Sequence, residues 1–391
     1  MLSTMDRAGN ILMALMYRTT LYKFNDTIQN TDHLGDIIIM KIDSAGNEIF
    51  NKSISGPCFE TINSIITDDN NNVFFTGQLD QNLNNCPTDF DGVPVLNDTL
   101  VYLAKMDSNG MYFWIKKYNV GVIDRIFTYA DNIYCHGRCT LTNNDIGGIG
   151  FSYPGNYDSK CFIAKLDQSG SCVWVRGFGN FYNGALGFVT PMSINVVKNR
   201  LYFTGSGNNQ IQNVFLFEGG STLNGIGIGN ESFMACYDTS GNFKWNSLLG
   251  NQNIEYISET ITDSNANVIG VGNIGSNGIT DAGVCSFDSS GNFLWLIAGG
   301  GNSTDVGSRI ASDSYGKIFI VGGTTSSGGC YMGNDTLYPP ANQSTMFFAS
   351  LDSIVTQWPM GNVDINVGDE FNFFQILAPT KCLLRFHLEQ V

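Results

Sequence analysis

The residues that most often perform catalysis or bind metals are few in this chain and widely spaced. Histidine occurs only as His33, His136 and His387, and the sequence suggests no Ser-His-Asp or Cys-His catalytic set. Zinc needs three or four nitrogen or sulfur ligands, but the one closely spaced cysteine pair, Cys135 and Cys139, has the spacing of a single strand and its turn. We therefore predict no catalytic, cofactor-binding or metal-ligating residue. We interpret His136 as a strand residue that packs in the interior.

Two asparagine-rich segments, Asp68–Asn72 and Asp263–Asn267, space oxygen atoms as a calcium-binding loop would. The same Asp and Asn pattern is typical of a tight hairpin turn, and it recurs in copies that lack extra carboxylates. We interpret both segments as turns and keep calcium as the alternative. The loop 80–98 is a third candidate for calcium. Its carboxylates are Asp80, Asp89, Asp91 and Asp98.

A phrase of about 14 residues recurs along the chain and explains why such turns are frequent. It reads apolar-apolar-Ala-Lys-apolar-Asp-x-x-Gly-x-x-x-Trp, and we name it unit A. Asp at the first turn position accepts a backbone hydrogen bond and Gly supplies a positive φ, so unit A predicts a β-hairpin. All five tryptophans occupy its last position, which predicts a packing role. The copies have their aspartates at Asp43, Asp107, Asp167, Asp238, Asp288 and Asp352 and their aromatic residues at Phe50, Trp114, Trp174, Trp245, Trp295 and Trp358.

A second phrase, unit B, alternates with unit A. It consists of an apolar strand, an Asp or Asn turn and a second strand that ends in glycine in most copies. The apolar segment 11–16 belongs to the first copy, and this is why we do not interpret it as a signal peptide. The copies span residues 2–16, 64–77, 127–137, 195–205, 260–272 and 309–322.

One A and one B unit together give four short antiparallel strands. Four-stranded repeats of this length, with variable loops between them, indicate a β-propeller. We predict an all-β fold with a single propeller of six four-stranded blades, or seven as the alternative. The N-terminal strands would join the C-terminal hairpin and close the ring, which removes open sheet edges. Residues 1–361 would form the propeller and residues 362–391 a cap or docking segment.

The A phrase, followed by a glycine-containing stretch and the B phrase, resembles the SBBP-type β-propeller repeat, FVAKLDxxGxxxWxxxxGG…DxxGNxYVTG. The resemblance covers roughly residues 1–360 in six imperfect copies. It implies a propeller of the kind found mostly in large extracellular or surface proteins. PQQ-type propeller repeats are also similar, but they usually carry one more residue before the glycine. The last copy, from Asp352 to Trp358, lacks the glycine of the turn.

Composition excludes some partners. The net charge is −15 with 20 Lys and Arg residues, whereas binding to a phosphate backbone needs clustered basic residues. No stretch approaches the roughly 18–20 apolar residues of a membrane span. We therefore expect neither nucleic acid nor membrane insertion.

Function is expected in the long loops that join a B unit to the next A unit, because loops on a rigid scaffold carry binding. We expect a non-catalytic structural or interaction module that binds a protein or a glycan, at a virion or an extracellular surface, with the cytoplasm as the alternative. The alternative function is a carbohydrate hydrolase or lyase at the mouth of the central channel, which would need converging carboxylates. The loops are 78–100, 138–160, 206–231 and 323–345, and their aromatic residues include Phe90, Tyr153, Tyr157, Phe215, Phe217 and Tyr338.

Overall fold

The structure is a computed structural model of the 391-residue chain, and it separates into two compact units, residues 1–251 (unit 1) and residues 252–391 (unit 2). It describes residues 2–351 and 371–375. Within the first range, the residues outside the description are 20, 24–25, 29–34, 58, 80–86, 96–100, 140–143, 152–156, 182–187, 210–213, 221, 226–228, 250–253, 277–278, 314, 333–334 and 340–343.

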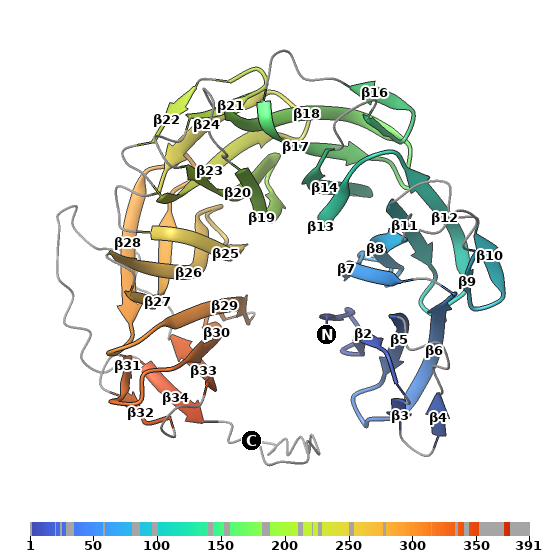
Figure 1. Ribbon diagram of the computed structural model, residues 1–391, viewed down its shortest axis with the longest axis horizontal. Coiled ribbons are helices and arrows are strands. Elements are labelled where there is room, and N and C mark those ends of the chain that lie inside the picture. Colours follow the sequence, from blue (N-terminus) through green and yellow to red (C-terminus); the bar gives the residue numbers. More distant parts are fainter. Residues whose placement is uncertain are drawn as a thin grey trace. The chain divides into compact units, whose positions relative to one another are not determined.

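The described residues form antiparallel β-strands and contain no helix. Unit 1 holds four sheets of four to six strands (Figure 1). Sheet 1 contains β1 (Leu2–Met5), β2 (Ile11–Tyr17), β5 (Asp36–Ile42), β6 (Glu48–Ser55), β9 (Thr88–Phe90) and β10 (Val93–Val95). Sheet 2 contains β7 (Glu60–Thr67), β8 (Val73–Leu79), β11 (Val101–Met106) and β12 (Tyr112–Tyr118).

Sheet 3 contains β13 (Val122–Tyr129), β14 (Asn132–Arg138), β17 (Tyr157–Leu166), β18 (Cys172–Phe181), β21 (Val214–Phe217) and β22 (Leu223–Asn224). Sheet 4 contains β19 (Phe188–Val197), β20 (Arg200–Asn209), β23 (Gly229–Asp238) and β24 (Phe243–Leu248). Two small hairpins lie in the connections, β3–β4 (Leu21–Lys23 and Asp26–Ile28) and β15–β16 (Asn144–Ile146 and Ile149–Phe151). The first strands of the four sheets, β1, β7, β13 and β19, lie side by side in chain order (Figure 1).

Unit 2 holds two four-stranded sheets and one small hairpin. Sheet 5 contains β25 (Ile254–Thr262), β26 (Val268–Ser276), β27 (Ile279–Phe287) and β28 (Phe293–Gly299). Sheet 6 contains β29 (Asp305–Ser312), β30 (Ile318–Thr324), β33 (Thr345–Leu351) and β34 (Phe371–Gln375), and the hairpin is β31–β32 (Cys330–Met332 and Asp335–Leu337).

The order of pairing corrects the expected closure of the ring. In sheets 1 to 5 a B hairpin is followed by the next A hairpin, so the N-terminal hairpin β1–β2 pairs through β2 with β5. The prediction that the N-terminal strands complete the last sheet is therefore wrong. The fourth strand of sheet 6 is β34, from the segment expected to be a cap, and it pairs with β33. The expected domain boundary after residue 361 stays a prediction, because residues 352–370 lie outside the description.

The aspartate turns are confirmed, and the described A turns share their geometry with four of the six B turns. In the turn at Asp43, the Gly46 N–H donates to the Asp43 carbonyl at 3.0 Å, and Oδ1 of Asp43 accepts from the Ala45 and Asn47 N–H groups at 2.9 and 2.8 Å. Gly46 has φ +85°, so this is a turn with glycine in the left-handed region, followed by a bulge. Aspartates with the same backbone bonds to the fifth residue of their turns are Asp6, Asp68, Asp107, Asp167, Asp238, Asp263, Asp288 and Asp313.

The closing glycine of unit B is required by the strand opposite. A bulge interrupts β7, β13, β19, β25 and β29 at equivalent positions. The glycine of the partner strand faces this bulge, and a Cβ on Gly77 would lie 1.8 Å from the carbonyl oxygen of Thr61. The equivalent Cβ on Gly272 would lie 2.0 Å from the Tyr256 carbonyl. Any larger residue there must move the backbone.

The apolar core lies between consecutive sheets. Separate clusters of buried residues join sheets 1 and 2, sheets 2 and 3, sheets 3 and 4, and sheets 5 and 6. Successive residues of a strand face opposite neighbours. In β14, Tyr134 belongs to the cluster with sheet 4, whereas Cys135 belongs to the cluster with sheet 2.

Candidate functional site

The repeated polar and aromatic residues of unit A join one sheet to the next. The indole Nε1 of Trp114 donates to the Gln168 carbonyl at 3.1 Å, and Nζ of Lys105 donates to the Gln168 side chain at 2.6 Å. One repeat later, Trp174 Nε1 and Lys165 Nζ both donate to one carbonyl of the next turn, at 3.1 and 3.4 Å. Because these Trp and Lys side chains bond to the neighbouring sheet, we assign them a structural role.

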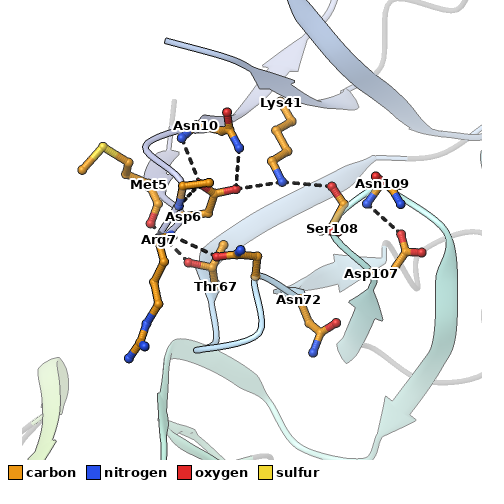
Figure 2. A network of polar contacts seen from close by, with 12 residues as sticks. Met5, Asp6, Arg7, Asn10, Lys41, Thr67, Asn72, Asp107, Ser108 and Asn109 are labelled. Carbon is orange, nitrogen blue, oxygen red and sulfur yellow. Dashed lines mark hydrogen bonds and ion pairs between the residues drawn. The ribbon is translucent and has the colours of Figure 1, made fainter.

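The first copy of this contact includes a buried ion pair (Figure 2). Nζ of Lys41 lies 2.8 Å from Oδ2 of Asp6 and donates to the Ser108 carbonyl at 2.9 Å. The side chains of Lys41 and Asp6 are 3% and 0% exposed. Burial acts to raise the pKa of Asp6, but hydrogen bonds from Lys41 and Asn10 outweigh it and lower the pKa below its usual value. The pair therefore ties the first B turn to the first A hairpin and to the turn of sheet 2.

The long loops carry β-hairpins that return to the outer strand of the preceding sheet. Hairpin β9–β10 pairs with β6 through Ile54 and Phe90, and β21–β22 pairs with β18 through Phe178 and Phe217. Hairpins β15–β16 and β31–β32 touch the ends of β12 and β28 through single bridges. The loops that we expected to bind a partner therefore contain hairpins that cover the outer edges of sheets.

Several loop aromatics that could have bound a partner are core residues instead. Phe90, Phe215 and Phe217 are buried, and Phe215 lies against Phe233 at a ring distance of 4.8 Å. Tyr338 is 65% exposed. Tyr153 and the side chain of Tyr157 lie outside the described residues.

One predicted loop, 323–345, does help to form a concave site, in unit 2. This site, which we name the depression, is open and has a volume of about 450 Å³. It lies where β28 ends, where β29 begins and where the turn after β30 leads into β31. Asp281 reaches it from β27. Its lining residues are Asp281, Gly300, Gly301, Asn302, Gly328, Gly329 and Tyr331.

Close backbone approaches shape the depression. A Cβ on Gly300 would lie 1.9 Å from Oδ1 of Asp281, and a Cβ on Gly301 would lie 2.1 Å from the Gly329 carbonyl oxygen. The Tyr331 N–H donates to the Gly300 carbonyl at 2.8 Å, which seats the hairpin against β28. The two glycines that follow the A unit in the sequence are therefore needed for this approach.

Two carboxylates interact beside the depression, which Asp281 lines and Asp305 does not. Asp305 is fully buried, and its Oδ2 accepts a 2.8 Å hydrogen bond from the Ser326 hydroxyl. The buried Oδ1 atoms of Asp305 and Asp281 have no donor, but the Asp281 carboxylate accepts a hydrogen bond from the Gly301 N–H, and the Cys330 thiol is hydrogen-bonded to Asp305. Burial raises the pKa of Asp281, and the charge of Asp305 raises it further. Burial also raises the pKa of the neighbouring Cys330 thiol to about 12, with Asp305 as the next largest cause.

The other candidate residues do not form a site. Burial lowers the pKa of His136 to about 3, so its ring is neutral in the interior. Its neighbour Cys135 faces the opposite side of the strand, in the apolar cluster between sheets 2 and 3. Among the described residues, no three His, Cys, Asp or Glu side chains are grouped to hold a metal ion. His33 and His387 lie outside the description.

In the asparagine-rich turns, for which calcium was the alternative, the aspartate carboxylates accept hydrogen bonds from the turn itself. Both carboxylate oxygens of Asp68 accept hydrogen bonds from within the turn, including one from Asn72 Nδ2 at 2.8 Å, and Asp263 does the same. In the loop 80–98, Asp91 pairs with Lys52 at 2.7 Å. Asp89 accepts from the Gly92 N–H. Asp80 and Asp98 lie outside the described residues.

Sequence reasoning missed Asp281 and Asp305, because neither lies in a repeated turn position. No described helix has the length and apolar character that crossing a membrane requires.

Comparison with known proteins identifies no family. No protein-family model and no curated protein matches the chain, so the SBBP resemblance rests on the residues alone. Among solved structures, the polysaccharide lyase Uly1 is similar with a TM-score of 0.40 and 9% identity, covering 96% of this chain and 89% of that chain. Sqt1 of Chaetomium thermophilum, bound to the N-terminus of the ribosomal protein L10, gives a TM-score of 0.31 and 10% identity, covering 80% and 91%. Likenesses of this degree carry no inference about what this chain does.

Proposed function

We propose that this chain is a non-catalytic binding module and that the depression in unit 2 receives a glycan. The observation that carries the proposal is the combination of one exposed aromatic ring with polar groups in a concave site. Tyr331 is 52% exposed, and Asp281 and Asn302 line the same depression. A tyrosine ring offers an apolar face to a sugar ring, and carboxylate and amide groups hydrogen-bond hydroxyls.

We propose further that the six sheets are the blades of one propeller. Supporting this, sheets 1 to 5 contain the same order of B and A hairpins, and sheet 6 begins with a B hairpin followed by the first strand of an A unit. Within each unit, neighbouring sheets also pack through apolar clusters. Such a scaffold would hold the loops rigidly and present the depression at strand ends, where ligand sites commonly lie.

The test is a broad glycan array, with calcium and with chelator, followed by titration of the strongest glycan. Tyr331→Ala removes an exposed ring, so it should leave stability nearly unchanged and weaken binding at least ~10-fold, about 1.4 kcal/mol. The matched control is Tyr315→Ala, which removes an equally large ring that is 89% exposed and lies outside the depression. Binding that survives in Tyr331→Ala, or an array without any saturable signal, would refute the proposal.

A carbohydrate hydrolase or lyase is the second candidate, because the raised pKa of Asp281 suits a general acid. Glycoside hydrolysis usually needs two carboxylates that flank the scissile bond. Here Asp305 is fully buried and bonded to Ser326, so only Asp281 faces a ligand. We therefore favour binding. Release of new reducing ends or unsaturated products from an array-selected glycan, abolished by Asp281→Asn, would reverse this preference.

A further inference from the structure

We propose that His136 is an acid sensor that loosens the packing between sheets 3 and 4 when its ring is protonated. The inference does not depend on the proposed glycan site, because His136 lies in unit 1 and the depression lies in unit 2. Acid would thus weaken the scaffold of unit 1 whether or not a ligand is bound in unit 2.

The first argument is that the ring is buried without a partner in another residue. His136 is 0% exposed. Among the described residues, no other residue is hydrogen-bonded to its Nδ1 or its Nε2. Buried polar groups in proteins are nearly always hydrogen-bonded, so an exception calls for an explanation. Packing alone does not explain this ring, because an apolar side chain of similar shape would pack there without losing contacts to water.

The second argument is the position of the ring between two sheets. Successive residues of a strand face opposite sides, so His136 shares the side of Tyr134, which belongs to the apolar cluster between sheets 3 and 4. On the neighbouring strand β17, His136 is paired with Ile163, another member of that cluster. Protonation would therefore place a charge in an apolar interface, where an unpaired charge is costly.

The third argument is that the nearby charges are mostly positive. Arg125 lies opposite His136 in the pairing of β13 with β14, and Arg138 lies two positions further along β14. Lys165 of β17 lies over the ring of Tyr134, with Nζ 5.7 Å from its centre. Burial, with the charges of Arg125 and Arg138 as further causes, lowers the pKa of His136 to about 3, although its own backbone acts in the opposite direction.

The groups that could offset a charge on the ring are already engaged. Asp124 of β13 is paired with Arg138 at 2.8 Å, and burial raises the pKa of Asp124. On the side of β17 that faces sheet 4, the Cys161 thiol donates to the Val189 carbonyl at 3.5 Å. The strand of sheet 4 that packs against β13, β14 and β17 is β19, and it contains no charged residue. Sheet 4 therefore offers no carboxylate from β19 to a protonated ring.

The direction of the pH dependence follows from the two states of the chain. The pKa of His136 is about 3 in the folded state and about 6.5 in the unfolded chain. Between these values the unfolded chain binds a proton that the folded chain does not, so stability falls as the pH falls. From this residue alone, each pH unit below about 6.5 raises the equilibrium constant for unfolding about tenfold. Asp124 acts in the opposite direction, because its raised pKa favours the folded state as the pH falls.

The experiment compares urea unfolding of the full-length wild type and His136→Phe between about pH 7.5 and pH 4.5. Phe keeps an aromatic ring, cannot be protonated and loses no hydrogen bond to another residue. We expect the unfolding constant of the wild type, divided by that of His136→Phe, to grow about tenfold per pH unit below about 6.5. Asp124 and the other carboxylates are present in both proteins, so their effects cancel in this ratio. Tyr134→Phe is the matched control, since it alters a buried ring on the same side whose pKa is raised to about 12, and its pH dependence should match the wild type.

A second measurement decides the matter even if His136→Phe does not fold. In the double variant His33→Gln and His387→Gln, His136 is the only histidine left. We expect the magnetic resonance signals of its ring to stay at their neutral positions from about pH 7.5 to pH 5 for as long as the protein is folded. Ring signals that titrate near pH 6.5 in the folded protein would overturn the proposal. So would a ratio of unfolding constants that does not change with pH, or a Tyr134→Phe variant that departs from the wild type as much as His136→Phe does.

Discussion

Gly241 lies in the turn of sheet 4, directly against the indole ring of sheet 3. It has φ +83°, and a Cβ there would lie 2.8 Å from Cδ2 of Trp174. Gly46 has the equivalent turn position in sheet 1 with φ +85°, but its Cβ would meet nothing within 4 Å. Alanine at these two sites therefore separates the cost of the backbone conformation from the cost of the contact between sheets.

The magnitudes follow from these contacts. A left-handed conformation costs a residue with a Cβ about 1–2 kcal/mol, and Gly46→Ala should lose about that much. Gly241→Ala should lose the same amount for its backbone conformation. It also displaces the Trp174 ring, which is 7% exposed and hydrogen-bonded through Nε1. Overpacking of this kind costs about 1–3 kcal/mol. We therefore expect Gly241→Ala to be less stable than Gly46→Ala by about 1–3 kcal/mol.

The assay is urea unfolding of the wild type and both variants, followed by circular dichroism, with free energies from the linear extrapolation. Trp fluorescence should also shift in Gly241→Ala, because the Trp174 ring must move. If Gly46→Ala is as destabilising as Gly241→Ala, the repeated Trp does not pack on the next turn and the account of unit A is refuted.

The remaining predictions concern the other repeated contacts. Lys41→Met leaves the buried carboxylate of Asp6 without its cation and should lower the free energy of unfolding by about 3–5 kcal/mol. Because the pKa of Asp6 is lowered in the folded state, its contribution is present above the unfolded value and is lost as the pH falls through the folded value. A melting series between about pH 7 and pH 2 should thus fall less steeply in Lys41→Met than in the wild type, and parallel curves would contradict this. Gly77→Ala forces the backbone of the bulge apart and should cost more than about 3 kcal/mol or prevent folding, whereas Gly323→Ala, whose nearest contact would be 3.9 Å away, should stay within about 1 kcal/mol in the same urea assay. Equal losses at the two glycines would refute the role given to the bulge.

Much of the local structure could be predicted from the sequence, because hairpins are specified locally. The Asp turn, the positive φ of the turn glycine and the apolar strands all depend on residues within a few positions of each other. This is why the all-β architecture and the turns at residues such as Asp43 and Asp263 were predictable. The pairing between hairpins was not predictable from the sequence, because an A hairpin could pair with the B hairpin before it or with the one after it. The observed pairing of β2 with β5 shows that it pairs with the one before it.

The site was less predictable than the fold. The loop 323–345, in which we expected binding, contributes Tyr331 to the lining of the depression, but its aromatic Tyr338 is not among the lining residues. Asp281 and Asp305 lie in strands far from any turn motif, and they meet only because sheets 5 and 6 pack together. A sequence signal did exist, since Asp36 and Glu60 have the same spacing, but it becomes visible only after the strands are aligned.

The most direct test of the claim that function is concentrated in the depression, and not in the repeated turns, is hydrogen–deuterium exchange of the wild type with and without the strongest glycan from the array. The account predicts slower exchange in residues 300–305 and 326–331 and no change in the aspartate turns of unit 1. Protection confined to those turns, or no protection at all, would contradict it.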